Sequence, residues 1–247
     1  MVPQKSSQAA FISELANKSL VPIISFSATS RALSSTPYFV RTTLNDSTQV
    51  KIISSIVKAY GGRKVVPIYE DTDYGRGIKP CLIDALQGTD TRIPYRSAIP
   101  LSATDDQIME ELYRVKTMQT REFIVHMTSS MGSRLFLKAK VAGMTSEGYA
   151  WIMTDGLANV VNSLDPSIID LMHGVLGVKS YVPKSRELHD FTIRWKRRFQ
   201  KDNPGEQLTE PTIFGCGLMI QFGQWPWWQR RSGWQMLPLR SHKLLQT

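Results

Sequence analysis

The sequence predicts an α/β protein with three layers, in which helices cover both faces of a parallel sheet. Short apolar runs of strand length alternate with amphipathic stretches of helical period, most regularly between Asp46 and Val178. This alternation indicates strand–helix–strand units, whose strands run parallel and are buried on both faces. Small, hydroxylated or acidic residues follow several strands, and open α/β sheets bind their ligands just outside those strand ends.

Helices are predicted where apolar residues recur at helical spacing behind polar start signals. The predicted helices cover residues 5–18, 46–60, 78–86, 104–115, 129–142 and 184–201. Asp46 with Gln49, and Thr104 with Gln107, have the spacing of capping boxes, and Ser129 with Ser130 is expected to cap the fifth helix. The second helix is expected to bury Val50, Ile53, Val57 and Tyr60, and the last to turn inward Leu188, Phe191, Trp195 and Phe199.

Strands are predicted for residues 20–24, 38–40, 65–69, 93–99, 123–127, 149–153 and 174–178. Pro94 and Pro100 flank the fourth strand, which indicates an edge position because proline cannot donate to a sheet ladder. The third strand leads through an acidic loop, which begins at Glu70, to Tyr74 and Gly75. Because ligands lie outside the carboxyl ends of such strands, we expect this loop to form one wall of a crevice.

The composition is that of a globular protein. The 247 residues are 42% hydrophobic and 21% charged, which suits one large or two small domains and excludes a disordered chain. The net charge of +9 is diffuse, so no nucleic-acid partner is expected. The two cysteines, Cys81 and Cys216, exclude a disulfide framework and a cysteine-based zinc site. The sequence shows neither a signal peptide nor a run long enough to span a membrane.

No motif for catalysis or cofactor binding is recognisable. The sequence lacks a P-loop, a nucleophile elbow and a zinc-type spacing, and the Gly75-Arg76-Gly77 run lacks the third glycine of a dinucleotide fingerprint. The histidines are scattered at His126, His173, His189 and His242, so no metal site is expected. The sequence therefore predicts no enzyme and no cofactor, and a small-molecule enzyme on a Rossmann-like sheet remains only an alternative.

Hydroxyl and carboxyl groups at strand and helix ends form a candidate binding site. Ser6 opens a helix, where backbone N–H groups favour an anion. Ser27 and Thr29 add hydroxyl donors, Tyr74 an aromatic face and a phenol, and Asp155 a carboxylate for an ammonium group. Such a set suits a zwitterionic amino acid. The same residue types are also ordinary turn and cap formers, which explains each of them individually.

Several of these segments together resemble the amino-terminal ligand-binding region of plant glutamate receptor-like channels. The similarity extends from about residue 3 to residue 214 and is carried by PQKSSQAAFISELANKSLVPIISFSATS, YFVRTTLNDSTQ, YEDTDYGRG and WIMTDG. It implies a bilobed fold of the type I periplasmic-binding-protein kind, which closes two lobes around an amino acid or similar small molecule. By the same resemblance, the ligand contacts are Ser6, Ser27, Thr29, Asp46, Tyr74 and Asp155.

The resemblance also divides the chain into lobes. It implies a partial first lobe in residues 1–44, a nearly complete second lobe in residues 45–180, and a return to the first lobe in residues 181–215. Part of the first lobe is therefore expected to be missing. Arg31 and Gly62 depart from the family pattern, in which we expect a proline and a tryptophan. The resemblance further implies the extracellular side of a membrane receptor, with other receptor subunits as partners; a non-functional truncated product is the alternative.

Residues 216–247 differ from the rest of the chain. They hold four of the six tryptophans, no acidic residue and no clean period. One interpretation is a Trp/Arg segment that contacts a membrane or a nucleic acid. The interpretation we prefer is a change of reading frame after Gly215, because one choice of codons reads WAYDTVWAMAMVAEK, an amphipathic helix, in another frame. The tail is then expected to be disordered.

Overall fold

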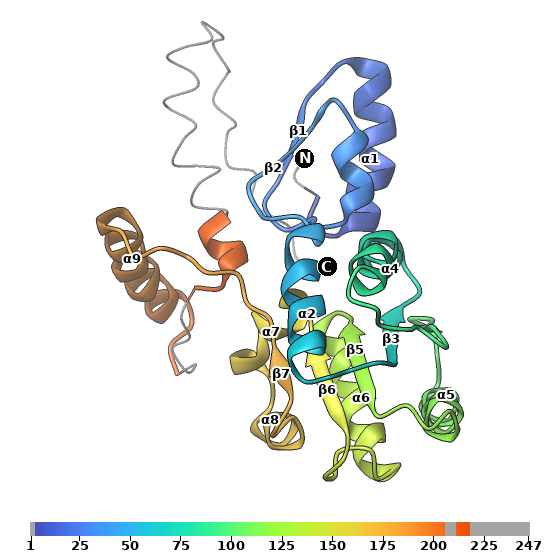
Figure 1. Ribbon diagram of the computed structural model, residues 1–247. Coiled ribbons are helices and arrows are strands. Elements are labelled where there is room, and N and C mark those ends of the chain that lie inside the picture. Colours follow the sequence, from blue (N-terminus) through green and yellow to red (C-terminus); the bar gives the residue numbers. More distant parts are fainter. Residues whose placement is uncertain (1–2, 206–210, 218–247) are drawn as a thin grey trace, which may run out of the picture.

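A five-stranded parallel sheet forms the centre of the computed structural model, which describes residues 3–205 and 211–217 (Figure 1). The strand order is β4-β3-β5-β6-β7, and every pairing is parallel. The strands are β3 (Val65–Glu70), β4 (Ser97–Ile99), β5 (Glu122–His126), β6 (Ala150–Met153) and β7 (Leu176–Gly177). The predicted α/β fold is confirmed, with β4 at the edge as its flanking prolines indicate.

Helices cover both faces of this large sheet and enclose two separate cores. The covering helices are α2 (Ser47–Ala59) and α4 (Lys79–Gln87) on one face, and α5 (Asp105–Thr117) and α6 (Ser129–Val141) on the other. Val65 packs into the first core and Val66 into the second, because successive side chains of a strand point to opposite faces. The shorter helices are α3 (Asp73–Gly77), α7 (Asp155–Ala158), η2 (Val161–Ser163) and α8 (Pro166–Leu171).

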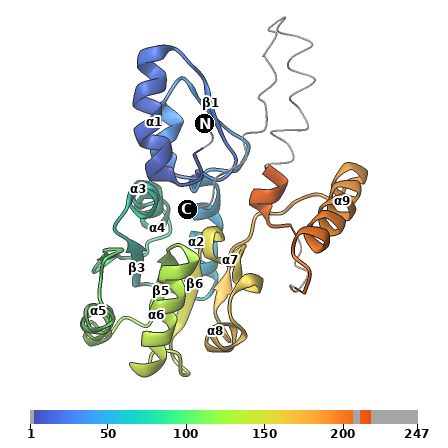
Figure 2. The same cartoon turned by 180° about the vertical axis from the view of Figure 1, so that it is seen from behind.

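The beginning of the chain forms a smaller unit beyond the carboxyl ends of the large sheet (Figures 1 and 2). This N-terminal unit consists of α1 (Ser6–Ser19), β1 (Ile23–Ser25), η1 (Arg31–Ser35) and β2 (Phe39–Arg41). Strands β1 and β2 form a parallel pair. The buried apolar cluster of this unit consists, among the described residues, of Ala9, Ala28 and Leu33, so the unit has little hydrophobic stabilisation of its own.

Helix α9 (Arg186–Asp202) stands to one side of both sheets in the two views (Figures 1 and 2). The prediction that its apolar side chains face inward is only partly right. Leu188, Phe191, Trp195 and Phe199 are half-buried, and no residue of α9 is fully buried. Trp195 and Phe199 stack on each other, with ring centroids 5.1 Å apart. The described part of the chain therefore covers the apolar face of α9 only in part.

One of the two predicted capping boxes forms. Thr104 accepts a bond from the backbone N–H of Gln107, whose side chain accepts one in return from the backbone of Thr104. The box predicted for Asp46 and Gln49 is wrong, because Asp46 accepts no capping bond. Asn45 Oδ1 instead accepts a bond of 2.8 Å from the N–H two residues further on. Asp46 and Gln49 have the spacing of a capping box, but both side chains are buried and hydrogen-bond to each other in the interior.

Two smaller predictions also fail at helix ends. Ser129 and Ser130 do not cap α6, because its N-cap residue is Thr128, whose hydroxyl donates to Glu70. Tyr60 does not face inward: it is the C-cap residue of α2 and is 77% exposed. Among the described helices, none is both long and apolar enough to cross a membrane. Most of the predicted tail, residues 218–247, lies outside the described residues.

The two cores predict how neighbouring residues of α6 contribute to stability. Phe136 is fully buried against Trp151, whereas Leu137 next to it is 42% exposed. We expect Phe136→Ala to lower the free energy of unfolding by about 3–5 kcal/mol, through lost burial and a cavity. Leu137→Ala, the matched control, should cost about 1 kcal/mol or less. Urea unfolding followed by circular dichroism measures both, and equal losses would contradict the described packing.

Candidate ligand-binding site

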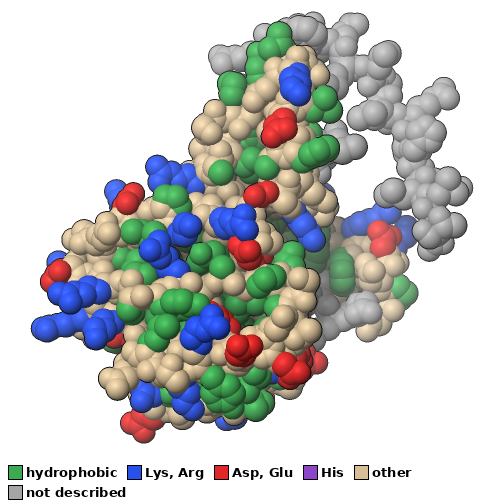
Figure 3. Space-filling view, turned by 90° about the vertical axis from the view of Figure 1, so that its right-hand side faces the viewer, with side chains coloured by type: hydrophobic (Ala, Val, Ile, Leu, Met, Phe, Trp, Pro, Cys, Tyr) green, Lys and Arg blue, Asp and Glu red, His purple; other side chains and the backbone are tan. Residues whose placement is uncertain are grey.

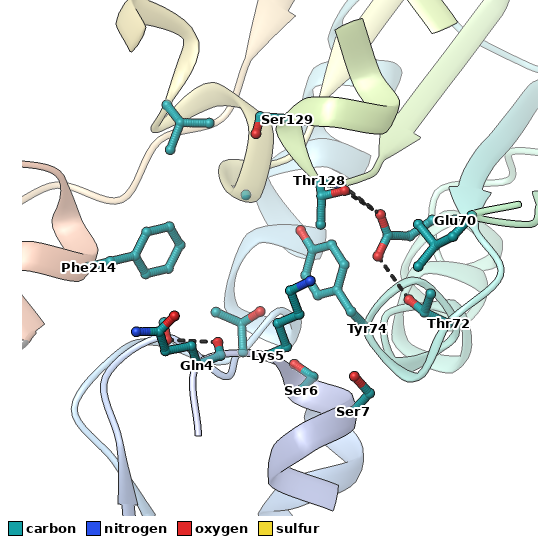
Figure 4. Close-up of a pocket in the computed structure, with 15 residues that line it drawn as sticks. Gln4, Lys5, Ser6, Ser7, Glu70, Thr72, Tyr74, Thr128, Ser129 and Phe214 are labelled. Carbon is teal, nitrogen blue, oxygen red and sulfur yellow. Dashed lines mark hydrogen bonds between the residues drawn. The ribbon is translucent and has the colours of Figure 1, made fainter. Parts of the chain in front are cut away.

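A cavity of about 290 Å³ lies between the N-terminal unit and the carboxyl ends of the large sheet (Figure 4). The N-terminal wall consists of Gln4, Lys5, Ser6, Ser7, Ser27 and Thr29. The opposite wall consists of Glu70, Thr72, Tyr74, Leu101, Thr128, Ser129, Gly156 and Val160, with Phe214 at one side. The size is at the lower end of pockets that hold small organic ligands. Four predicted site residues line it: Ser6, Ser27, Thr29 and Tyr74.

The N-terminal wall presents hydroxyls and the start of α1. In Figure 4, Lys5, Ser6 and Ser7 extend from the first turn of α1 toward the opposite wall. The buried Ser6 hydroxyl accepts a bond of 3.2 Å from the backbone N–H of Ser30, so its own hydrogen is free to donate. The Ser27 hydroxyl donates to the carbonyl of Gln4 at 2.8 Å. This wall therefore offers donors and a positive charge, which suit an anionic group.

Tyr74 presents a fixed aromatic ring on the opposite wall. Its ring packs against that of the buried His126, with centroids 4.2 Å apart. Its hydroxyl is buried without a hydrogen-bond partner among the described residues. Gly156 makes room for that hydroxyl, since a Cβ at this position would lie 2.0 Å from the oxygen. Burial, with the nearby carboxyl groups of Asp46 and Asp155, raises the pKa of Tyr74 well above its ordinary value, so the phenol stays neutral.

Asp46 and Asp155, the other two predicted contacts, do not line the cavity but lie behind Tyr74. Gln49 joins them: its Nε2 donates to Asp155 Oδ1 at 2.7 Å and to Asp46 Oδ1 at 3.4 Å. Its Oε1 accepts a bond of 2.8 Å from the backbone N–H of Asp155. We call this Asp46–Gln49–Asp155 set the polar network. The structure thus brings all six predicted residues into one region. Four of them line the cavity, and Asp46 and Asp155 lie in a layer behind them.

Burial disfavours the charged forms of the acidic groups of the polar network and of the neighbouring His126. Burial, and then the neighbouring Asp155, raise the pKa of Asp46 to about 8, against weaker opposing effects that include Arg41. Burial also raises the pKa of Asp155, mainly through loss of solvation. Burial lowers the pKa of His126 to about 4, so its ring is neutral near pH 7. Asp46 Oδ2 is 4.0 Å from His126 Nε2, and with both groups uncharged this contact is not an ion pair.

Glu70 provides the carboxylate of the cavity wall, although the sequence does not single it out as a binding residue. Glu70 is 2% exposed and accepts bonds of 2.9 Å and 2.8 Å from the backbone N–H and the hydroxyl of Thr128. It also accepts a bond of 2.9 Å from the Thr72 hydroxyl. All three donors are neutral, and no cation of the described chain pairs with it.

Two further residues of this region were also missed, His126 and Gln49. In the sequence, His126 is only one of four scattered histidines, and Gln49 has only the spacing of a capping residue. Glu70 and His126 share one signal that could have revealed them, because each is the last residue of a buried strand. Within the described part of the chain, no group of three or more His, Cys, Asp or Glu side chains could hold a metal ion.

The fold has a parallel α/β sheet that meets a second unit at its carboxyl ends, with a cavity between the two. The chain belongs to the family described as "Receptor family ligand binding region", whose profile matches residues 1–218. The predicted resemblance is therefore confirmed at the level of the family, and the periplasmic-binding-protein-like fold agrees with it.

Plant glutamate receptors are among the similar proteins. The chain is 51% identical over 199 residues to Glutamate receptor 2.2 of Arabidopsis thaliana, which covers 80% of this chain and 22% of that protein. It is 51% identical over 216 residues to Glutamate receptor 2.5 of the same plant, covering 87% of this chain and 23% of that protein. The chain thus spans less than a quarter of the length of these relatives.

The shifted pKa values of Asp46 and His126 predict how the free energy of unfolding depends on pH. Asp46 holds a proton in the folded chain that the unfolded chain releases. Its contribution to the free energy of unfolding therefore falls as pH rises from about 4 to about 8. His126 acts in the opposite sense between about pH 4 and 6.5, because only the unfolded chain binds its proton there. Above pH 6.5 the Asp46 effect is unopposed, and we expect the free energy of unfolding to fall by about 2 kcal/mol up to pH 8.

Urea unfolding at pH 6.5 and pH 8 tests this expectation. Asp46→Asn, which imitates the neutral acid, should remove the fall. Asp190→Asn makes the same chemical change at an exposed site on α9 and should leave the fall in place. An unchanged fall in Asp46→Asn would show that Asp46 does not carry the proton.

Proposed function

We propose that the chain is a ligand-binding module of a plant glutamate receptor-like channel and that it binds an amino acid or a related small zwitterion in the cavity. The observation that carries the proposal is the opposed chemistry of the two walls. One wall offers Lys5, Ser6 and the first turn of α1, and the other offers Glu70 and the ring of Tyr74. A carboxylate suits the first wall and an ammonium group suits the second.

On the N-terminal wall, Ser6 is the best placed donor for the ligand carboxylate, because its hydrogen has no acceptor among the described residues. Ser27 would have to release the carbonyl of Gln4 before it could donate to a ligand. Thr29 lines the same wall and also accepts, through its carbonyl, a bond of 3.0 Å from the backbone N–H of Asp46. Thr29 therefore connects this wall with the polar network behind the other.

On the opposite wall, Glu70 is the carboxylate that reaches the cavity, and we assign the ligand ammonium to it in this arrangement. Tyr74 adds the face of its ring, which attracts a cation. The predicted ammonium contact at Asp155 requires a further movement, because Gln49 occupies one of its oxygens and Tyr74 lies in front of it. Asp46 and Asp155 here act from behind, as partners of Gln49.

The channel role is a proposal that rests on the relatives. This chain spans only about 22% of their length, so the channel would be formed by other parts of such a receptor. In an intact receptor of this kind, closure of the two units around the ligand would be passed to a channel formed with other subunits. The module would then lie on the extracellular side of the membrane. The relatives carry receptor names, and the proposal includes neither an enzymatic activity nor a cofactor.

Calorimetric titration of the full chain with the common L-amino acids tests the proposal. At least one should bind, and Glu70→Gln should weaken its binding about tenfold or more, because a charge-assisted hydrogen bond to the ammonium is lost. Ser6→Ala should weaken it as well. Glu14→Gln removes the same charge from the exposed face of α1 and should leave the affinity unchanged.

The N-acetyl derivative of the same amino acid, which lacks the ammonium charge, supplies the matched ligand. It should bind the wild-type chain more weakly than the amino acid does, and Glu70→Gln should abolish this difference. If no amino acid binds to a chain that melts cooperatively, the proposed function is wrong. If an amino acid binds equally well to Glu70→Gln, the function stands and the role of Glu70 is wrong.

A further inference from the structure

The charges in the walls of the cavity limit which amino acid side chain it accepts. Among the described residues that line the cavity, Lys5 carries a positive charge, Glu70 carries a negative charge, and the others are uncharged. The carboxylate and the ammonium group of a bound amino acid use both of these partners. A further charge on the ligand side chain would have no opposite charge left in the walls, and a charge that loses its water without gaining a partner is costly.

Apolar side chains line the same cavity and have surface left to cover. These are Leu101, Val160 and Phe214. Leu101 is 56% exposed and the other two are half-buried, so an apolar group of a ligand would remove further apolar surface from water. In Figure 4, the ring of Phe214 points into the cavity from the side opposite Glu70. The ligand side chain can therefore pack there without displacing the group that we assign to the ammonium.

Phe214 belongs to a short helical turn that is tied to the N-terminal unit. Within the turn, the backbone N–H of Cys216 donates to the carbonyl of Thr212 at 3.0 Å. The hydroxyl of Thr42, the residue that follows β2, donates to the carbonyl of Gly217 at 2.9 Å. These bonds hold the turn beside the cavity, so that Phe214 has a defined place in its wall.

Several hydroxyls of the walls are already engaged with other groups of the chain. The Ser27 hydroxyl donates to the carbonyl of Gln4, and the hydroxyls of Thr72 and Thr128 donate to Glu70. A polar ligand side chain would have to compete with these bonds, whereas an apolar side chain leaves them intact. The arrangement therefore favours apolar over polar side chains among the uncharged ones.

The outer surface adds no strong preference for one sign of charge. On the face of the molecule seen in Figure 3, basic and acidic side chains are interspersed. A surface of one sign would concentrate ligands of the opposite sign, and this face is not of that kind. The selection of charge therefore depends on the cavity walls.

We infer that the cavity selects an amino acid with an uncharged, apolar side chain and that Phe214 is a specificity-determining residue, because it contacts this side chain. This selectivity rests on the proposed function, since it concerns the same ligand in the same cavity. Lys5, Ser6, Glu70 and Tyr74 hold the groups that all amino acids share, and Phe214 distinguishes between their side chains.

Calorimetric titration of the full chain with L-leucine, L-asparagine and L-aspartate tests this selectivity, because the three side chains branch alike and differ in polarity and charge. Leucine should bind most tightly, and aspartate should bind about tenfold more weakly or worse, because its second carboxylate lacks a partner. Glycine reports the contacts of the main chain alone. Phe214→Ala should weaken the binding of leucine about fivefold, through lost apolar burial, and leave the affinity for glycine unchanged.

Phe11→Ala is the matched control, because it makes the same truncation at a residue of α1 that is 76% exposed and does not line the cavity. It should retain the wild-type affinity for leucine. Aspartate that binds as tightly as leucine would overturn the selectivity and leave the proposed function in place. So would a Phe214→Ala variant that retains the affinity for leucine, or one that weakens glycine and leucine equally. If none of the four ligands binds, the selectivity is wrong, and the titration with all the common L-amino acids decides the proposed function separately.

Discussion

The placement of Gln49 between Asp46 and Asp155 is the interaction on which the candidate site depends. A buried amide can bridge two carboxyl groups only if repulsion between them is relieved, and the raised pKa values of both acids indicate that a proton relieves it. The bridge fixes the start of α2 to the start of α7, which are 106 residues apart in the sequence. With His126 it also fills the space behind Tyr74, so that the ring has one position at the cavity wall. A buried polar network of this kind rigidifies its surroundings only when its members are satisfied.

The contact between the N-terminal unit and the large sheet is different in kind, because it is narrow and polar. Ser30 donates to the backbone carbonyl of Asp73 at 3.2 Å, and the Arg31 guanidinium contacts the Cys81 sulfur. The residue where the family pattern has a proline is thus engaged across the two units. No apolar cluster among the described residues extends from one unit into the other. Units joined in this way can move relative to each other at low cost, which a module that closes around a ligand requires.

The sequence predicted the architecture well because the large sheet depends on local periodicity. The strand predicted for residues 65–69 is observed as Val65–Glu70, since its wholly buried pattern fits only a central strand. The sequence could not predict interactions that depend on distant partners. Gln49 has the spacing of a capping residue, but Asp155 offers it a buried partner, and the tertiary contact prevails. The local sequence places Glu70 in an acidic loop, because nothing local shows that Thr128 holds it at a cavity wall.

Two glycines of the large-sheet unit lie where a polar side chain from another element comes close to the backbone. At the carboxyl ends, Gly156 leaves room for the hydroxyl of Tyr74, and at the amino ends Gly62 leaves room for the carboxylate of Glu122. Neither glycine needs its conformational freedom here, because neither has a positive φ. Each is instead required by the close approach of a polar atom that comes from another element. A side chain at either position would displace that atom, so these two glycines are required by the side chain that approaches them and not by their own backbone conformation.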